Sequence, residues 1–140
     1  MLCGVEIDFP QGLAGHSDAD VVTHALMDAL LGAAGLDDIG ALFPDDDPAY
    51  AGASSVALLR EVVSRIQAAG WVVGNVDVTV VCERPRLAPY RQAMRAALAG
   101  VLGVAEDAVG IKATTTEGMG FEGRGEGVAA SAVCLLQRAE

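Results

Sequence analysis

Basic side chains are scarce in this sequence, which has 9 Lys and Arg against 19 Asp and Glu and a formal net charge of −10 at pH 7. Non-specific binding to nucleic acid or to an anionic membrane needs basic surface, so the composition argues against both kinds of partner. A phosphorylated ligand would need divalent cations or a few local basic groups to offset this charge. No nucleic acid and no membrane are therefore expected as partners.

Long apolar runs and paired cysteines are also missing. No run approaches the length of a transmembrane helix, and Glu6 and Asp8 come too early for a signal peptide. Cys3, Cys82 and Cys134 are widely spaced and lack the paired spacing of a metal site. We expect free, buried thiols in a cytoplasmic protein.

Aromatic residues make up only 4% of the chain, whereas 52% is hydrophobic, mainly Ala, Val and Leu. Such a composition suits helices packed closely on a sheet. A length of 140 residues favours a single domain spanning 1–140.

Hydrophobic periodicity predicts seven elements in the order β, α, α, β, α, β, β. They are a strand near Cys3 to Phe9, a helix starting around Ser17 to Asp20, a helix from Ser54 or Ser55 to Gly70, a strand from Trp71 to Cys82, a helix through Met94 to Leu102, a strand from Val109 to Thr115 and a strand from Gly127 to Gln137. This order indicates an α/β protein, specifically an α+β two-layer sandwich with a mixed β-sheet and helices on one face.

The last predicted strand is apolar on both faces. Val128, Ala130, Ala132 and Cys134 lie on one side, and Ala129, Ser131, Val133 and Leu135 on the other. Helices can cover only one face, so the other face is expected to pack against a partner subunit.

Both histidines fall within the acidic stretch from Gly15 to Asp47. Asp20, His24 and Asp28 follow one another at steps of four, which places the imidazole between two carboxylates on one helix stripe. Met27 and Leu31 share this side, so we expect the helix to be covered on both sides and His24 to lie in or near an interface or cleft. The histidine is either partly buried and bonded to a neighbouring Asp, or a metal ligand or general base.

His16 stands in a turn at the start of this helix, where anions bind readily to free N–H groups. After the helix, Gly40 and Pro44 interrupt an acidic loop. Its carboxylates either keep the loop in water or bind cations or sugar hydroxyls; they are Asp37, Asp38, Asp45, Asp46 and Asp47.

Two further segments carry ligand-type residues. Lys112 to Glu117 reads KATTTE and leads into the Gly-rich run from Gly118 to Gly127. Together these residues form either a strand end with a flexible turn or a phosphate cradle that uses Lys112 and Arg124. Arg84 and Arg86 flank Pro85 in either a solvated loop or a second set of anion contacts.

Four motifs resemble, in order, those of the 2-C-methyl-D-erythritol 2,4-cyclodiphosphate synthase family of the non-mevalonate isoprenoid (terpenoid) pathway. They read HSDADVVTHALMDALLGAAGLDDIGALFPDDDP, GNVDVTVV, IKATTTEGMGF and GRGEG, and the resemblance runs from about Gly4 to Leu136. It implies a lyase that is a homotrimer with interfacial active sites. The 2-phosphate of 4-diphosphocytidyl-2-C-methyl-D-erythritol 2-phosphate would attack its own β-phosphorus with divalent-metal assistance, releasing CMP.

The resemblance also assigns roles by position. It implies zinc at His24, a second metal (Mg²⁺ or Mn²⁺) near Glu117, and catalytic positions at His16, Asp38 and Thr115. For the substrate it implies contacts from His16, Ser17, Asp38, Gly40, Phe43, Asp45 and Asp47, and for cytidine and its diphosphate from Cys82, Pro85, Arg86, Leu87, Thr114 and Thr115. It places Phe121, Arg124 and Glu126 at a cavity on the trimer axis that would hold an isoprenoid diphosphate or another anion.

The chain departs from the family at one point. The family's Asp-x-His strand, which supplies two zinc ligands, lies upstream of the point where this sequence starts, and Asp8 does not replace it. Catalytic zinc normally takes three protein ligands. The missing strand is explained by a late start or a fragment, by real loss of the strand, or by a zinc ligand from another chain. The alternatives to an enzyme are a catalytically impaired trimeric homologue that binds a nucleotide or anion, and a structural module.

Overall fold

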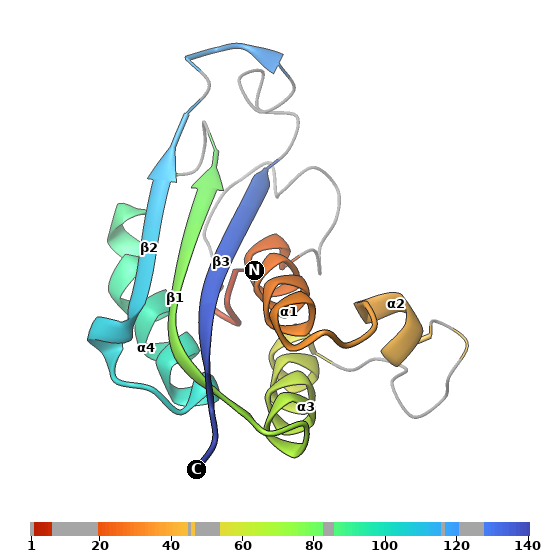
Figure 1. The fold of residues 1–140 in the computed structure, drawn as a ribbon. Helices are drawn as coiled ribbons and strands as arrows, with labels where there is room; N and C mark the ends of the chain where they lie inside the picture. The colour runs from red at the N-terminus through yellow and green to blue at the C-terminus, as the bar shows by residue number, and fades with distance from the viewer. Residues whose placement is uncertain are drawn as a thin grey trace.

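The computed structural model describes residues 2–6, 20–44, 46, 54–82, 86–115, 117–120 and 128–140. The elements, shown in Figure 1, are α1 (Val21–Ala34), α2 (Ile39–Leu42), α3 (Ser55–Ala68), β1 (Trp71–Val81), the 3-10 turn η2 (Ala88–Tyr90), α4 (Arg91–Leu102), the 3-10 turn η3 (Glu106–Ala108), β2 (Val109–Thr114) and β3 (Ala129–Arg138). In this described part of the chain no helix is long and apolar enough to span a bilayer.

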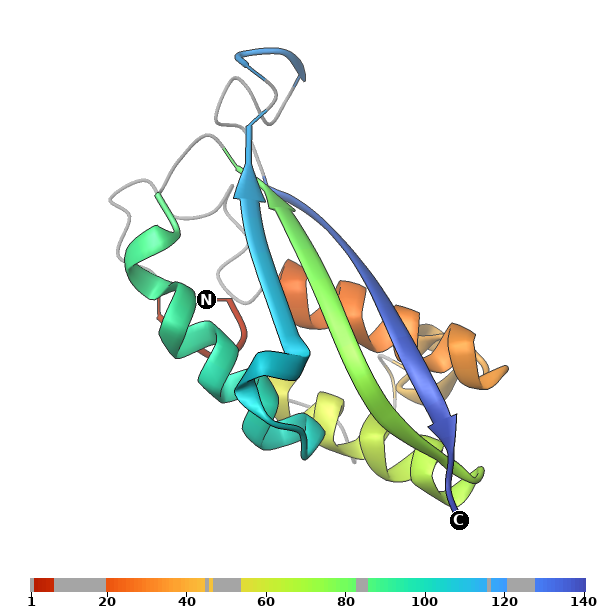
Figure 2. The same ribbon diagram turned by 60° about the vertical axis from the view of Figure 1, so that its left-hand side comes forward.

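Strand β1 is the centre of a three-stranded sheet with the order β2-β1-β3. It pairs in parallel with β2, from Val76 opposite Val109 to Val81 opposite Thr114, and antiparallel with β3. Figures 1 and 2 show α1, α3 and α4 on the same face of this sheet. The predicted mixed sheet with helices on one face is confirmed.

The side chains of β1 alternate between the two faces of the sheet. Val76, Val78 and Val80 are buried beneath the helices, whereas Asp77 and Thr79 are only half-buried on the opposite face. The core consists mainly of aliphatic side chains from the helices; its fully buried members include Leu26, Met27, Leu30, Leu31, Leu59, Val62, Ile66, Met94 and Leu98. Met27 and Leu31 are thus covered, as predicted.

The strand predicted from Cys3 is wrong for the residues that are described there. Leu2 and Val5 form a tight antiparallel bridge, with N···O distances of 2.9 and 2.7 Å. Cys3 and Gly4 turn the chain with φ values of 53° and 73°. A β-carbon on Gly4 would lie 2.6 Å from Val56, so this turn needs glycine both for its φ and for its close approach to α3.

Helix boundaries follow local capping. Asp20 caps α1 by accepting from Thr23 N at 3.1 Å, and Ser54 caps α3 by accepting from Ala57 N at 3.1 Å. The more N-terminal candidates for the start of α1, Ser17 and Asp18, lie outside the described residues. Helix α2 falls within the predicted acidic loop and is a correction: Asp38 accepts from Ala41 N at 2.9 Å, and a single turn is too short to produce a periodic pattern.

Candidate functional site

A pocket opens where the parallel strands β1 and β2 end. We call it the strand-end pocket; it has a volume of about 400 Å³ and is lined by Cys82, Arg86, Leu87, Ala88, Ala113, Thr114 and Thr115. Five of these seven side chains are among the nucleotide contacts predicted from the sequence. The remaining member of that predicted set, Pro85, lies outside the described residues.

Strand pairing brings the two halves of this pocket together. Cys82 N donates to Thr114 O at 2.9 Å, which continues the β1–β2 ladder one residue beyond β1. The carboxyl ends of parallel strands meet at one edge of a sheet, so the segment after β1 and the threonines after β2 face the same space. Leu87 is buried beside η2 and provides an apolar wall.

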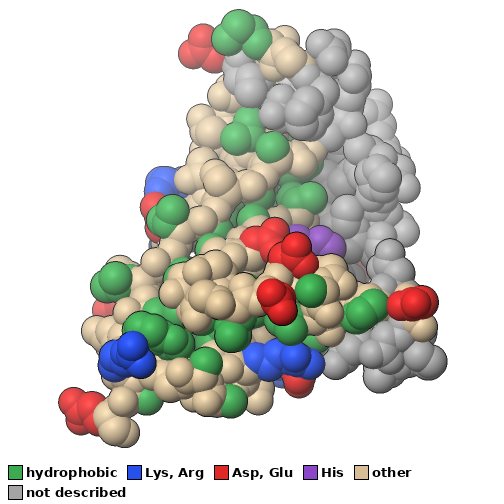
Figure 3. Space-filling model, turned by 45° about the vertical axis from the view of Figure 1, so that its right-hand side comes forward, with side chains coloured by type: hydrophobic (Ala, Val, Ile, Leu, Met, Phe, Trp, Pro, Cys, Tyr) green, Lys and Arg blue, Asp and Glu red, His purple; other side chains and the backbone are tan. Residues whose placement is uncertain are grey.

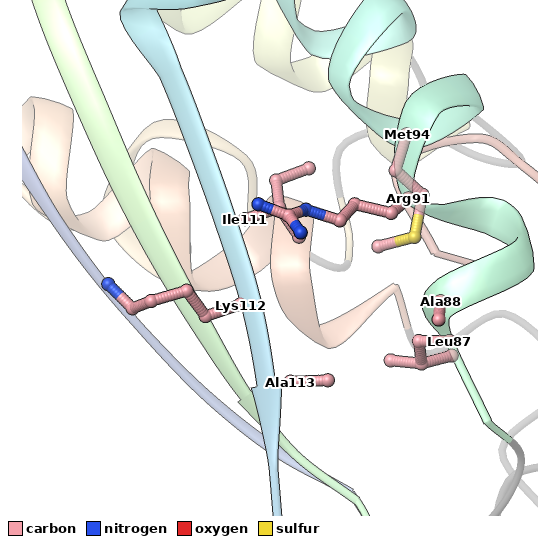
Figure 4. A pocket seen from close by; sticks show the side chains of 7 residues that line it. All are labelled: Leu87, Ala88, Arg91, Met94, Ile111, Lys112 and Ala113. Carbon is pink, nitrogen blue, oxygen red and sulfur yellow. The ribbon is translucent and has the colours of Figure 1, made fainter.

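A second pocket of about 290 Å³, the side pocket, adjoins the first along β2 (Figure 4). It is lined by Leu87, Ala88, Arg91, Met94, Ile111, Lys112 and Ala113, and shares Leu87, Ala88 and Ala113 with the strand-end pocket. Figure 4 shows Arg91 reaching from α4 toward Ile111. Sequence reasoning missed Arg91, because a basic residue at the start of a helix gives no sign of a neighbouring pocket.

The ammonium group of Lys112 does not belong to either pocket. Figure 4 shows its side chain directed away from Arg91 and Met94, and its Nζ lies 2.5 Å from Asp77 Oδ2 of β1. Gly110 leaves the space for this pair, since a β-carbon there would come within 2.8 Å of Asp77 Oδ1. In the single chain the Lys112 ammonium group is thus paired with Asp77, and its part in a phosphate cradle stays a prediction.

Asp20 does not bond to the imidazole of His24. It is 1% exposed, and its carboxylate accepts from Cys3 N (2.7 Å), Gly4 N (3.0 Å), Thr23 N (3.1 Å) and Ser55 Oγ (2.7 Å). The N-cap conformation, φ −79° and ψ 76°, takes this residue off the helical stripe. His24 and Asp28 are both exposed, so the alternative of a partly buried histidine bonded to a neighbouring Asp is wrong. The other alternative, a metal ligand or general base, stays a prediction.

The described residues do not assemble a metal centre: within them, no three His, Cys, Asp or Glu side chains lie close enough to hold one ion. Figure 3 shows acidic side chains gathered on the side of the molecule that carries α1 and α2. Glu117 is exposed with φ 56°, and its N donates to Thr115 Oγ1 at 3.2 Å. A single described imidazole, His24, does not fit zinc, which takes three or four ligands.

The segment from Asp38 to Phe43 lies beside α1 and α3. Asp38 and Gly40 are exposed on α2, while Phe43 is 6% exposed with the Arg65 guanidinium 5.7 Å from the centre of its ring. Arg65 also pairs with Glu61, one turn earlier on α3, at 3.1 Å. The other predicted site residues lie outside the described residues: His16, Ser17, Asp45, Asp47, Phe121, Arg124 and Glu126.

Comparison with known proteins gives consistent matches over the whole chain. The model of the YgbB family matches residues 1–137. A 2-C-methyl-D-erythritol 2,4-cyclodiphosphate synthase of Methylococcus capsulatus is 62% identical over 138 residues, which cover 99% of this chain and 87% of the relative.

Solved structures agree with the sequence matches. A CDP-bound 2C-methyl-D-erythritol-2,4-cyclodiphosphate synthase superposes with a TM-score of 0.87 at 39% identity, covering 98% of this chain and 89% of that one. The bifunctional IspDF of Campylobacter jejuni superposes with a TM-score of 0.91 at 42% identity; the match covers 99% of this chain and 37% of that longer one.

Proposed function

This chain belongs to the YgbB family, and from that premise we propose that it is a 2-C-methyl-D-erythritol 2,4-cyclodiphosphate synthase, as its 62% identical relative is named. It is a lyase of non-mevalonate isoprenoid biosynthesis. Its substrate is 4-diphosphocytidyl-2-C-methyl-D-erythritol 2-phosphate. The 2-phosphate oxygen forms a bond to the β-phosphorus, the bond from that phosphorus to the CMP oxygen breaks, and CMP leaves.

The observation that carries the proposal is the strand-end pocket. Its walls combine apolar surface from Leu87 and Ala113 with hydroxyls from Thr114 and Thr115 and a guanidinium from Arg86. Apolar walls suit a pyrimidine ring, and a guanidinium with nearby hydroxyls suits a diphosphate. A solved relative of the same fold holds CDP.

The residues of this chain act by positioning the two ends of the substrate. Nucleophile and electrophile belong to one substrate molecule. Fixing its cytidine end at the strand-end pocket of one subunit and its erythritol end near Asp38 and Gly40 of the neighbouring subunit favours the folded conformation in which they meet. Thr115, which lines the pocket, is proposed to contact the diphosphate, and His16 is proposed to contact the attacking phosphate.

A divalent metal, when bound, would neutralise phosphoryl charge during the displacement. We expect His24 to contribute to zinc binding and Glu117 to a site for Mg²⁺ or Mn²⁺. The described residues do not by themselves fit zinc. Because His24 is exposed, His24→Ala should lower the zinc content per chain, measured by mass spectrometry, without changing the melting temperature.

We further propose a homotrimer with active sites between subunits. Its support is the sheet face turned away from the helices, where Val133 is 66% and Leu135 is 58% exposed. An isoprenoid diphosphate or another anion on the trimer axis, near Phe121 and Arg124, is part of the same proposal. Three free cysteines suit a cytoplasmic location.

The test is release of CMP from the authentic substrate with zinc and magnesium present. We expect turnover by the natural chain, and a loss of about tenfold or more in kcat/KM for Arg86→Met, because a charge-assisted contact to a phosphate would be removed. Arg60→Met, at an exposed position of α3, is the matched control.

The second candidate, a trimeric nucleotide- or anion-binding protein without turnover, is favoured by the lack of a three-ligand metal cluster among the described residues. Tight CDP binding by calorimetry together with no CMP release would support it over the synthase.

A further inference from the structure

Arg65 of α3 makes two contacts that have no place in the function described so far. Its Nε lies 3.1 Å from Glu61 Oε1, one turn earlier on the same helix. Its guanidinium carbon lies 5.7 Å from the centre of the Phe43 ring, which follows directly after α2. Glu61 thus helps to hold the guanidinium over an aromatic ring from a different element.

Helix α2 depends on such contacts for its orientation. It has four residues, and its hydrogen bonds run from Ala41 N to Asp38 Oδ1 (2.9 Å), from Leu42 N to Asp38 O (3.1 Å) and from Phe43 N to Ile39 O (2.8 Å). A single turn is unstable by itself in water, because so few hydrogen bonds do not offset the entropy lost on ordering the chain. Packing must therefore hold it.

Phe43 is the deepest anchor of this turn. It is 6% exposed and belongs to the core, whereas Ile39 and Leu42 are partly buried and Gly40 and Ala41 are exposed. The backbone of Phe43 closes the last hydrogen bond of α2, so a shift of its ring is transmitted to the turn that carries Asp38 and Gly40. A cation above the ring limits such a shift by electrostatic attraction to the ring face.

We propose that Arg65 is a positioning residue for the erythritol end of the substrate. It holds Phe43, and through Phe43 the segment from Asp38 to Phe43, in the orientation in which Asp38 and Gly40 meet the substrate. Arg65 itself touches no substrate. This inference rests on the proposed function for its ligand, and on the structure alone for the mechanical link between α3 and α2.

The first experiment tests the link without any need for activity. Hydrogen exchange of the amides of Ala41, Leu42 and Phe43 is measured by NMR in the full chain for Arg65→Met and for Arg60→Met. Methionine keeps most of the aliphatic stem of arginine but removes the charge. We expect exchange about 2- to 5-fold faster at these three amides in Arg65→Met only, with unchanged exchange along α3.

Equal exchange rates in the two variants would overturn the proposal, whatever the activity of the protein. Faster exchange throughout α3 would overturn it too, since the effect would then be a general loosening of that helix. Arg65→Lys, which keeps a cation over the ring, should restore most of the protection.

The second experiment divides the substrate into its two ends. We expect Arg65→Met to raise KM for the diphosphocytidyl substrate about 2- to 5-fold while the dissociation constant for CDP stays the same. The ends of β1 and β2, next to the residues that line the strand-end pocket, lie far from α2 within the chain (Figure 1). A parallel loss of CDP affinity, or an unchanged KM, would contradict the positioning role. If the natural chain shows no turnover, the proposed function fails, and the exchange measurement still decides the link.

Discussion

At the scale of single residues, one buried carboxylate joins three segments of the chain. Asp20 accepts from two amides of the N-terminal turn, from the first turn of α1 and from the hydroxyl of Ser55 at the start of α3. Buried charge is costly unless its hydrogen bonds are complete, and four donors meet that demand. This group fixes where α1 begins, and therefore where His24 stands.

Asp20→Asn should destabilise the protein by about 2 to 4 kcal/mol, because the amide NH₂ would face donors where a carboxylate oxygen accepts. Chemical denaturation followed by circular dichroism measures the change. Ser55→Ala, which removes one of the four donors, should cost less, about 1 kcal/mol. Equal stability of natural protein and Asp20→Asn would contradict the assigned role of the carboxylate.

Cys3 links stability to alkaline pH. Burial, and secondarily the neighbouring Asp20 carboxylate, raises the pKa of the Cys3 thiol far above its ordinary value of 9.0. Above pH 9 the unfolded thiol ionises while the folded one keeps its proton, so its contribution to stability is complete below pH 9 and falls as pH rises, by about 1.4 kcal/mol per pH unit.

Denaturation midpoints from pH 8 to pH 10.5 test this expectation. In Cys3→Ala the fall of the unfolding free energy with pH should be shallower by about 1.4 kcal/mol per pH unit. Cys134→Ala is expected to change this slope less, because Cys134 is less buried and burial alone raises its pKa. An identical slope in natural protein and Cys3→Ala would show that the thiol does not resist ionisation.

At the scale of elements, β1 organises the sheet and contains one irregularity. Its register with β3 shifts between Val73 and Asn75, so that Gly74 forms a bulge. A β-carbon at Gly74 would lie 3.0 Å from the carbonyl oxygen of Leu135, so a side chain here would require the backbone of the neighbouring strand to shift.

Gly74→Val should therefore destabilise the protein by about 1 to 3 kcal/mol, by forcing β1 and β3 apart at the bulge. Thermal unfolding measures the loss, and Thr79→Val, a half-buried position in the regular part of β1, serves as the control. A melting temperature in Gly74→Val equal to that of the control would mean that the sheet opens at this point without cost.

At the scale of the whole molecule, the two faces of the sheet differ. Helices cover one face, and the other exposes Val133 and Leu135 beside the ion pair of Asp77 and Lys112. An exposed apolar face on a β-sheet favours burial against another chain. The ion pair lies among these residues and would restrict how a second sheet can pack there.

Leu135→Lys should reduce the mass in solution from about three chains to the single chain of 14.3 kDa, because a charge would enter the proposed contact. Light scattering after size exclusion gives the mass, and far-UV circular dichroism should remain unchanged since Leu135 is exposed in the single chain. Ser64→Lys, exposed on α3, is the control. A natural chain that runs as a monomer would contradict the assembly.

The layers of the fold and much of the strand-end pocket could be predicted from the sequence alone. The alternation of Val76, Val78 and Val80 and the helical periods of Leu59, Val62 and Ile66 predict the layers, because burial of one face depends only on local spacing. The motifs identified the family and named five of the seven residues that line the strand-end pocket.

Tertiary structure alone decided the partners of polar groups. Sequence spacing placed Asp20 beside His24 and left Lys112 between a strand end and a phosphate cradle. In the structure Asp20 completes a buried hydrogen-bond set from three segments, and Lys112 pairs with Asp77 across two strands. The same holds for Arg65 over Phe43. A side chain's spacing along its own element says which face it occupies, but the group it meets there is set by segments distant in sequence, which only packing brings together.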